Sequence, residues 1–152
     1  MKKLLLLCLL AMTLCLCGCW DKSELSEIFM VSGVALDPGK DGQVQVTLEI
    51  LQVTEKDEKT TEPTGAYFTA SGDTVAKAIE QIGQMAGKRL FWAHNQVVIL
   101  GEAAAREQVS KYLDFFMREN DINSNAYVAV SQGEAAKLLQ SKVNGSATVS
   151  TA

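Results

Sequence analysis

Residues 43–51, QVQVTLEIL, decide the fold of this chain, because polar and apolar side chains alternate from Gln43 to Ile50. The apolar members, which share one face of an extended chain, are Val44, Val46, Leu48 and Ile50. Such an alternation predicts a strand with one buried face and one solvated face. The opposite face, which carries Gln45, Thr47 and Glu49, is therefore expected to meet solvent.

A second strand is expected immediately before this one. Ile28–Leu36 is rich in apolar residues, and Gly33 within it marks a point where another part of the chain can approach the backbone closely. Residues 37–42, DPGKDG, are dense in turn-forming residues. Together these segments predict an antiparallel hairpin at the start of the domain.

The region after the hairpin is predicted to contain a loop, a short strand and a helix. Val53–Gly65 is polar and contains Pro63, which is typical of an exposed loop, and Ala66–Ala70 follows as the short strand. A helix is expected over Thr74–Ala86. Its inward face should consist of Val75, Ile79, Ile82 and Ala86. We expect the residue before it, an aspartate, to cap its start, and the glycine after it to end it.

The second half alternates between strands and helices. Arg89–Ala93 and Gln96–Leu100 are apolar runs separated by two residues, so they form either a tight hairpin or one bent strand. We expect a helix over Ala103–Met117, a strand over Tyr127–Val130 and a short helix over Glu134–Gln140. The inward residues of the longer helix should be Val109, Leu113, Phe116 and Met117. The predicted fold class is α+β: a mixed sheet with an N-terminal β-hairpin and about three helices packed on it.

The N-terminus has the layout of a secretory signal. Two lysines follow Met1, an apolar run extends over Leu4–Leu16, and the small residue Gly18 precedes Cys19. The apolar run is shorter than the roughly 20 residues that a membrane-spanning helix needs. A cleaved signal is therefore favoured over a transmembrane anchor.

Residues 16–19, LCGC, resemble a lipobox, the cleavage motif of bacterial lipoproteins. That motif needs a small residue to fit the signal peptidase and a thiol that takes a diacylglycerol thioether before cleavage. Gly18 stands before Cys19, whereas leucines stand before Cys15 and Cys17. We therefore predict cleavage between Gly18 and Cys19, with diacylglycerol and an N-acyl chain on Cys19.

Cleavage there changes the composition of the mature chain. It removes three of the four cysteines, and the lipid occupies the fourth, which excludes disulfides, cysteine-dependent catalysis and Cys-based zinc sites. It also removes two of the fourteen basic residues and none of the eighteen acids, so the mature net charge is −6. This charge argues against nucleic acid as a partner. It argues equally against electrostatic capture by anionic lipid, so membrane contact is assigned to the anchor.

These observations divide the chain into four parts. Residues 1–18 form the lipoprotein signal peptide, and 19–27 form a membrane-proximal tether. Residues 28–141 form the folded domain. Residues 142–152 are small and polar, and are expected to be a tail or a truncation point.

No group of residues indicates catalysis. His94 is the only histidine and has no acid near it in sequence, so we expect a structural, hydrogen-bonded histidine instead of a general base. The acids of residues 55–62 alternate with lysines and are interpreted as a solvated surface, with weak calcium binding as the alternative. No nucleophile elbow or Gly-rich phosphate loop is present. We predict that the chain is not an enzyme and needs no cofactor or metal.

Five stretches occur in a recognisable order and spacing: 18–21 (GCWD), 31–37 (VSGVALD), 71–74 (SGDT), 89–102 (RLFWAHNQVVILGE) and 112–118 (YLDFFMR). In the order and spacing of these five stretches, the chain resembles the Ger(x)C family, the lipoprotein C subunits of spore germinant receptors. The family usually carries a further basic residue shortly after the position of Arg118, where this chain has residues 123–125, NSN. Family members also run far longer, so the resemblance is to their first domain.

The resemblance implies a non-enzymatic subunit that acts in spore germination with two integral-membrane partners, an A-type subunit and a permease-like B-type subunit. It implies a place on the extracytoplasmic face of the spore inner membrane, and it transfers no catalytic residue. The alternative is an extracytoplasmic solute-binding lipoprotein, which would need a pocket with convergent polar groups. A surface hydrolase is the third and least favoured interpretation.

Overall fold

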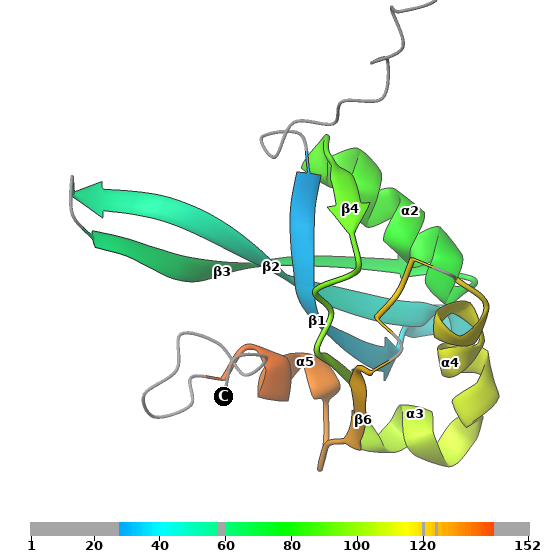
Figure 1. The fold of residues 1–152 in the computed structure, drawn as a ribbon. Coiled ribbons are helices and arrows are strands. Elements are labelled where there is room, and N and C mark those ends of the chain that lie inside the picture. Colours follow the sequence, from blue (N-terminus) through cyan, green and yellow to red (C-terminus); the bar gives the residue numbers. More distant parts are fainter. Residues whose placement is uncertain (1–27, 58–59, 120, 124, 142–152) are drawn as a thin grey trace, which may run out of the picture.

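The computed structural model describes residues 28–57, 60–119, 121–123 and 125–141. Its strands form one mixed sheet in the order β3-β2-β1-β5-β6, with β4 also paired to β1 (Figure 1). The strands are β1 (Ile28–Pro38), β2 (Val44–Asp57), β3 (Thr60–Gly72), β4 (Arg89–Phe91), β5 (Val97–Leu100) and β6 (Tyr127–Val130). β1 pairs antiparallel with β2, and β2 pairs antiparallel with β3. By contrast, β4 and β5 run parallel to β1, and β6 runs parallel to β5. The predicted α+β class is confirmed.

The predicted N-terminal hairpin is present as β1 and β2. Its turn is the short helical segment η2 (Lys40–Gly42). Asp41 and Gly42 both have positive φ, 53° and 78°, which suits the Asp-Gly pair that favours tight hairpin turns. The turn is closed by a 3.0 Å hydrogen bond from the Gln43 N–H to the Lys40 carbonyl.

The predicted loop over Val53–Gly65 is wrong. β2 continues to Asp57 and β3 starts at Thr60, so the two strands form a hairpin that extends beyond the other strands (Figure 1). Pro63 is tolerated because β3 lies at the edge of the sheet, where a missing N–H need not break a ladder on both sides. The several threonines of this stretch favour a strand more than its overall polarity suggests.

Among the described residues, four helices accompany the sheet: α2 (Val75–Ala86), α3 (Glu102–Glu107), α4 (Val109–Arg118) and α5 (Ala135–Leu139). The cap of α2 is Thr74, whose Oγ1 accepts the Lys77 N–H at 3.2 Å. The predicted cap, Asp73, instead accepts a hydrogen bond from the side chain of Gln43. The helix ends as predicted at Gly87, which has φ 64°, a conformation that favours glycine.

The predicted helix over Ala103–Met117 is two helices. The chain breaks at Gln108, whose φ of −159° and ψ of 93° are extended. The break changes the direction of the helix axis between α3 and α4. In α4, Tyr112 is buried, and Phe115 and Phe116 pack edge-on against Trp92. Two of the residues predicted to face inward do not: Val109 is exposed, and so is Met117.

The two apolar runs after α2 do not form a hairpin. β4 pairs with the first residues of β1, from Ile28 to Met30, and β5 pairs with Gly33–Leu36, both in parallel. The arrangement is therefore closer to the alternative of one bent strand, interrupted between Phe91 and Val97.

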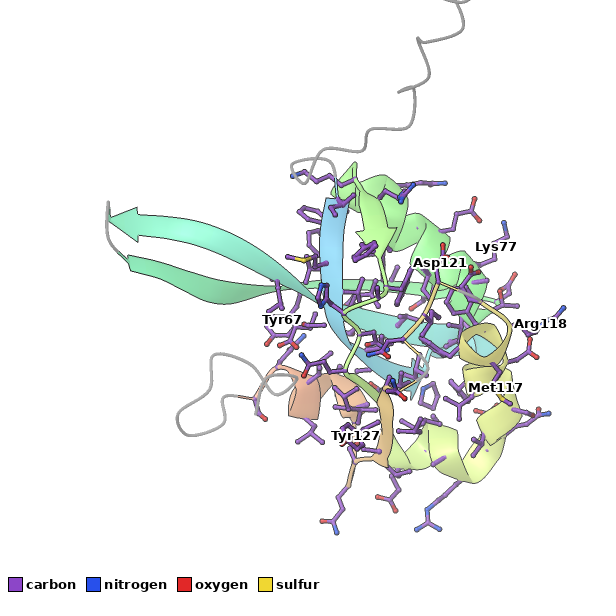
Figure 2. The ribbon with its side chains drawn as sticks, viewed as in Figure 1. Tyr67, Lys77, Met117, Arg118, Asp121 and Tyr127 are labelled. Atoms are coloured by element: carbon purple, nitrogen blue, oxygen red, sulfur yellow. The ribbon has the colours of Figure 1, made fainter. Side chains whose placement is uncertain are left out.

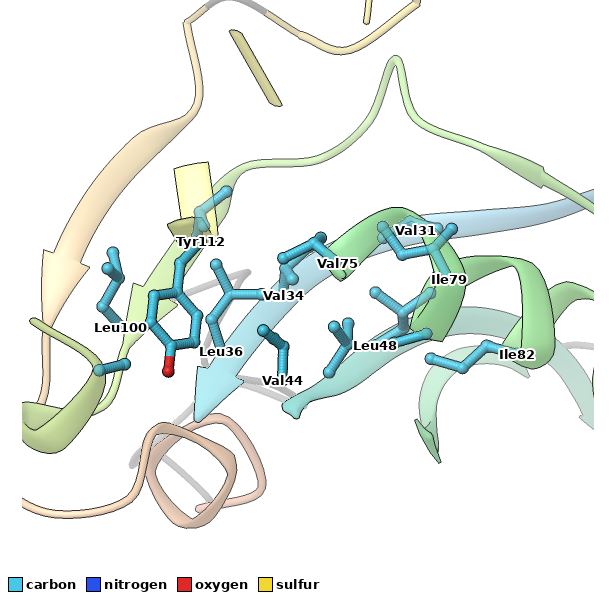
Figure 3. Packing of buried hydrophobic residues seen from close by; sticks show 14 of the residues in the cluster. Val31, Val34, Leu36, Val44, Leu48, Val75, Ile79, Ile82, Leu100 and Tyr112 are labelled. Atoms are coloured by element: carbon cyan, nitrogen blue, oxygen red, sulfur yellow. The ribbon is translucent and has the colours of Figure 1, made fainter. Parts of the chain in front are cut away.

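The main core lies on one face of the sheet, beneath α2, α3 and α4 (Figure 3). The alternating apolar residues of β2 are all fully buried in it, as predicted. They meet Val31, Val34 and Leu36 of β1 and the inner residues of α2. Each such side chain removed from water stabilises the fold by roughly 1.5–3 kcal/mol.

The second face of the sheet is covered by α5, which corrects the prediction that this face meets solvent. Thr47 is almost fully buried, and Glu49 is fully buried. A small apolar cluster, made by Ala35, Ile99, Ala135 and Leu139, joins α5 to the sheet. Gly33 is the predicted point of close approach, because a Cβ there would lie 2.8 Å from Cδ1 of Leu139.

Within the residues that the structure describes, no helix is both long and apolar enough to cross a membrane. The predicted signal peptide (1–18), tether (19–27) and tail (142–152) fall outside those residues. Their boundaries stay predictions.

Candidate functional site

The residues with the strongest sequence prediction, Gly18 and Cys19, lie outside the described residues. The described domain offers three candidate sites of its own. They are a cleft where the parallel strands end, a buried polar cluster beneath α5, and an apolar surface along β6.

The cleft lies where β1, β5 and β6 end at the same edge of the sheet, a common place for binding sites in folds with parallel strands. Its volume is about 1030 Å³, and its walls come from the end of β1, the first turns of α3 and α5, and the loop after β6. Sequence reasoning missed this cleft, because it treated residues 37–42 as a turn and nothing more.

Asp37 organises this edge. Its side chain is buried, and its two carboxyl oxygens accept the N–H groups of Ala135 and Ala136 at 2.8 and 2.9 Å. These are among the first N–H groups of α5, which have no partner inside the helix. Gly101 gives the carboxyl group room, since a Cβ there would overlap an oxygen of Asp37. Asp37 therefore joins the end of β1 to the start of α5.

The charged groups around the cleft are paired within their own helices. Arg106 binds Glu102 at 2.9 Å, and Lys137 binds Glu134 at 2.9 Å. The hydrogen bond from Arg106 is the main cause that lowers the pKa of Glu102 below its ordinary value. Within each of these two ion pairs the charges neutralise each other, and the remaining acid of the cleft, Asp37, is bound by backbone N–H groups of α5.

The polar cluster beneath α5 is built around Glu49. Ser32 Oγ donates to Glu49 Oε2 at 3.0 Å, and the Tyr67 hydroxyl donates to Oε1 at 2.9 Å. The same hydroxyl lies 3.3 Å from the carbonyl oxygen of Leu139, at the end of α5. Tyr67 thus points from β3 toward α5 (Figure 2). Burial, and then the hydrogen bond to Glu49, raise the pKa of Tyr67 to about 12. It remains a protonated donor at neutral pH, which suits holding α5 more than transferring protons.

The loop between β4 and β5 contains the predicted structural histidine, and that prediction is wrong. His94 is exposed, its ring lies 6.0 Å from that of Phe91, and it forms no hydrogen bond with any described residue. The buried polar residue of this loop is its neighbour Asn95, whose side-chain amide has no partner among the described residues. The described residues also contain no group of three or more His, Cys, Asp or Glu side chains placed to hold a metal.

An apolar surface lies along β6 and the adjacent α4. Tyr127, Val128 and Val130 of β6 are 80%, 59% and 61% exposed, and Met117 of α4 is 84% exposed. Figure 2 shows Met117 on the outer side of its helix. A groove of about 450 Å³ runs between α4 and β6 and is lined mostly by apolar side chains. Within the described sheet, β6 pairs on one side only. An open strand beside an apolar groove is a common setting for protein contact.

Comparison with known proteins gives one consistent result. The family model described as "Spore germination protein N-terminal domain" matches residues 21–152. Spore germination protein B3 of Bacillus subtilis is 28% identical over 127 residues, which cover 82% of this chain and 34% of that protein. Spore germination protein A3 of the same organism is 27% identical, over 86% of this chain and 36% of that protein. Spore germination protein YndF is 25% identical, over 93% of this chain and 41% of that protein.

The chain thus spans between about a third and two fifths of the length of these relatives. No solved structure matches it.

Proposed function

Because the chain belongs to the spore germination protein N-terminal domain family, we propose that it is a lipid-anchored, non-enzymatic subunit of a nutrient germinant receptor. The observation that carries this proposal is the position of the family match. It begins at residue 21, two residues after Cys19, where the lipobox ends. The folded domain would then stand on the extracytoplasmic face of a membrane, which is the spore inner membrane for a germinant receptor.

The mechanism we propose is positional. The diacylglycerol and N-acyl chains on Cys19 confine the domain to a thin layer above the bilayer. Confinement raises the effective concentration of the domain near its integral-membrane partners, the A-type and B-type subunits, so a weak contact is sufficient. The exposed apolar residues of β6 and α4 support a contact of this kind.

The anchor is tested by two matched cysteine variants. Cys19→Ala should abolish the incorporation of radiolabelled fatty acid and leave the signal peptide uncleaved, so that the chain keeps the mass of its precursor. Cys17→Ala, which removes a thiol two residues away, should still be labelled and cleaved. Fatty-acid labelling of the Cys19→Ala protein would contradict the anchor.

The receptor role is tested by purification from spore membranes. An affinity-tagged, lipidated chain should retain polytopic membrane proteins after mild detergent extraction. A tagged unrelated lipoprotein from the same membranes is the control. Recovery of the chain without any polytopic partner would contradict the role.

The alternative function, solute binding by an extracytoplasmic lipoprotein, is favoured by one observation, the cleft at the ends of β1, β5 and β6. Equilibrium dialysis against amino acids and sugars distinguishes the two functions. Saturable binding that is lost when Gln132 and Lys137 at the cleft are replaced would support solute binding. We prefer the receptor subunit, because the charges around this cleft are already paired.

A further inference from the structure

One end of the domain, where β1 begins, carries cationic and apolar side chains together. Figure 1 shows the start of β1, β4 and the end of α2 side by side at this end. Arg89 pairs with Ile28 in the sheet, and the Lys88 ammonium lies 4.7 Å from the centre of the Phe29 ring. Both cationic residues are exposed, and Met85 on the last turn of α2 is 58% exposed. We call Phe29, Met85, Lys88 and Arg89 the proximal surface.

The charge of the proximal surface differs from that of the whole chain. The segments that build it, residues 28–36 and 81–101, contain two cationic residues and no acid. Neither Lys88 nor Arg89 forms a salt bridge with another described residue. By contrast, each of the cationic residues Lys77, Arg106, Lys111, Arg118 and Lys137 pairs with an acid on its own helix or beside it. The proximal surface is thus locally basic in an acidic chain.

The position of this surface follows from the length of the tether. Eight residues, 20–27, separate the acylated Cys19 from Ile28, the first residue of β1. Even fully extended, they reach only about 30 Å. The start of β1 therefore stays within about 30 Å of the bilayer, which lets the proximal surface reach the headgroups. The cleft lies at the opposite end of the same strands.

We infer that the proximal surface rests on the membrane, with Lys88 and Arg89 contacting the phosphate groups of anionic lipids and Met85 beside them at the headgroup layer. This inference rests on the proposed lipid anchor. The tether itself carries three acids and one lysine, and the mature chain has a net charge of −6, so the contact is too weak to capture an unanchored chain. Once the anchor confines the domain, each cation near an anionic surface favours the docked orientation about fivefold.

The test uses the full lipidated chain in vesicles. An environment-sensitive fluorophore is placed on a single introduced cysteine, Gln84→Cys beside the proximal surface or Gln132→Cys near the cleft. Vesicles contain either phosphatidylglycerol with phosphatidylcholine or phosphatidylcholine alone, each with a headgroup-attached quencher. We expect the label at position 84 to be quenched at least fivefold more than the label at 132 in the anionic vesicles.

Charge reversal identifies the responsible residues. K88E with R89E should bring quenching at position 84 down to the level seen in phosphatidylcholine alone. The matched control, K40E with R106E, changes the charge equally at the opposite end and should leave quenching unchanged. K88Q with R89Q gives a milder second variant, and circular dichroism checks that each variant is folded.

Two results would overturn the inference, and they can be told apart. If the chain floats with vesicles but positions 84 and 132 are quenched equally, or the control variant has the same effect, the domain does not dock through this surface. If the chain fails to float with vesicles at all, the lipid anchor itself is wrong, and the inference falls with it.

Discussion

The two faces of the sheet are held by different means. One face is covered by α2, α3 and α4 over a broad apolar core. The other is covered by the five-residue helix α5, which rests on a small apolar cluster and on a few polar contacts at its two ends. Asp37 holds the start of α5, and Tyr67 lies at its end. The first face gains stability from buried area, whereas the second depends on the geometry of individual bonds.

The largest change in the free energy of unfolding should come from truncating one leucine to alanine on each face of the sheet. Leu48→Ala, in the main core, should lower the free energy of unfolding by about 4 kcal/mol, because the strands around it cannot close the cavity. Leu139→Ala, on the inner side of α5, should lower it by about 2 kcal/mol, because a helix of five residues can shift to fill the space. Urea unfolding followed by tryptophan fluorescence measures both. An equal or larger loss for Leu139→Ala would show that α5 is as rigidly packed as the main core.

The next effect should come from the bond that starts α5. Asp37→Asn keeps one oxygen acceptor but turns an amide group toward a backbone N–H, which should destabilise the fold by about 2 kcal/mol. Hydrogen exchange should speed up mainly in α5. Asp41→Asn is the control, because Asp41 lies in an exposed turn at positive φ, where asparagine is well tolerated. A loss spread evenly over the sheet would argue against a local role for Asp37.

The smallest change in the free energy of unfolding should come from replacing one tyrosine by phenylalanine on each face of the sheet. Tyr67→Phe should destabilise by about 1 kcal/mol at pH 7, because buried Glu49 loses a donor. Tyr112→Phe should cost less, because its partner Glu107 is exposed and can bind water instead. Both hydroxyls have a folded-state pKa raised to about 12, against 10 in the unfolded chain. Their contribution is therefore complete below pH 10 and is lost as the pH rises toward 12.

Urea unfolding at pH 7 and between pH 10 and 12 checks this pair. Each Phe variant should lose less stability than the original chain over the alkaline range. If neither variant changes the alkaline slope, the two pKa values are not raised, and the hydroxyls contribute nothing through their ionisation.

Sequence patterns predicted the elements whose side chains repeat regularly. The alternation around Leu48 gave β2 and its buried face, and the spacing of Val75, Ile79 and Ile82 gave α2. The Asp-Gly turn gave the first hairpin. In each case one face is covered by a large apolar surface, so burial and sequence period agree.

The features that sequence patterns missed depend on contacts between distant segments. Glu49 was expected in solvent, because nothing near it in sequence indicates that α5, ninety residues later, will cover it. The chain leaves the helical conformation at Gln108, although glutamine is a good helix former. The break allows Tyr112 to enter the main core, which also contains Trp92. Asp37 was seen as part of a turn, because its bonds to Ala135 and Ala136 span almost the whole domain.

β1 is both the first strand after the tether and the one with the most neighbours, with β2 on one side and β4 and β5 on the other. If Cys19 is anchored as we propose, a mechanical pull from the membrane would enter the domain at the first residue of β1. A pull directed along β1 would load its hydrogen bonds to both sides in shear, so that they share the force instead of opening one after another. If the proposed anchor holds, a domain built in this way would take up tension from the membrane without being peeled apart from β1.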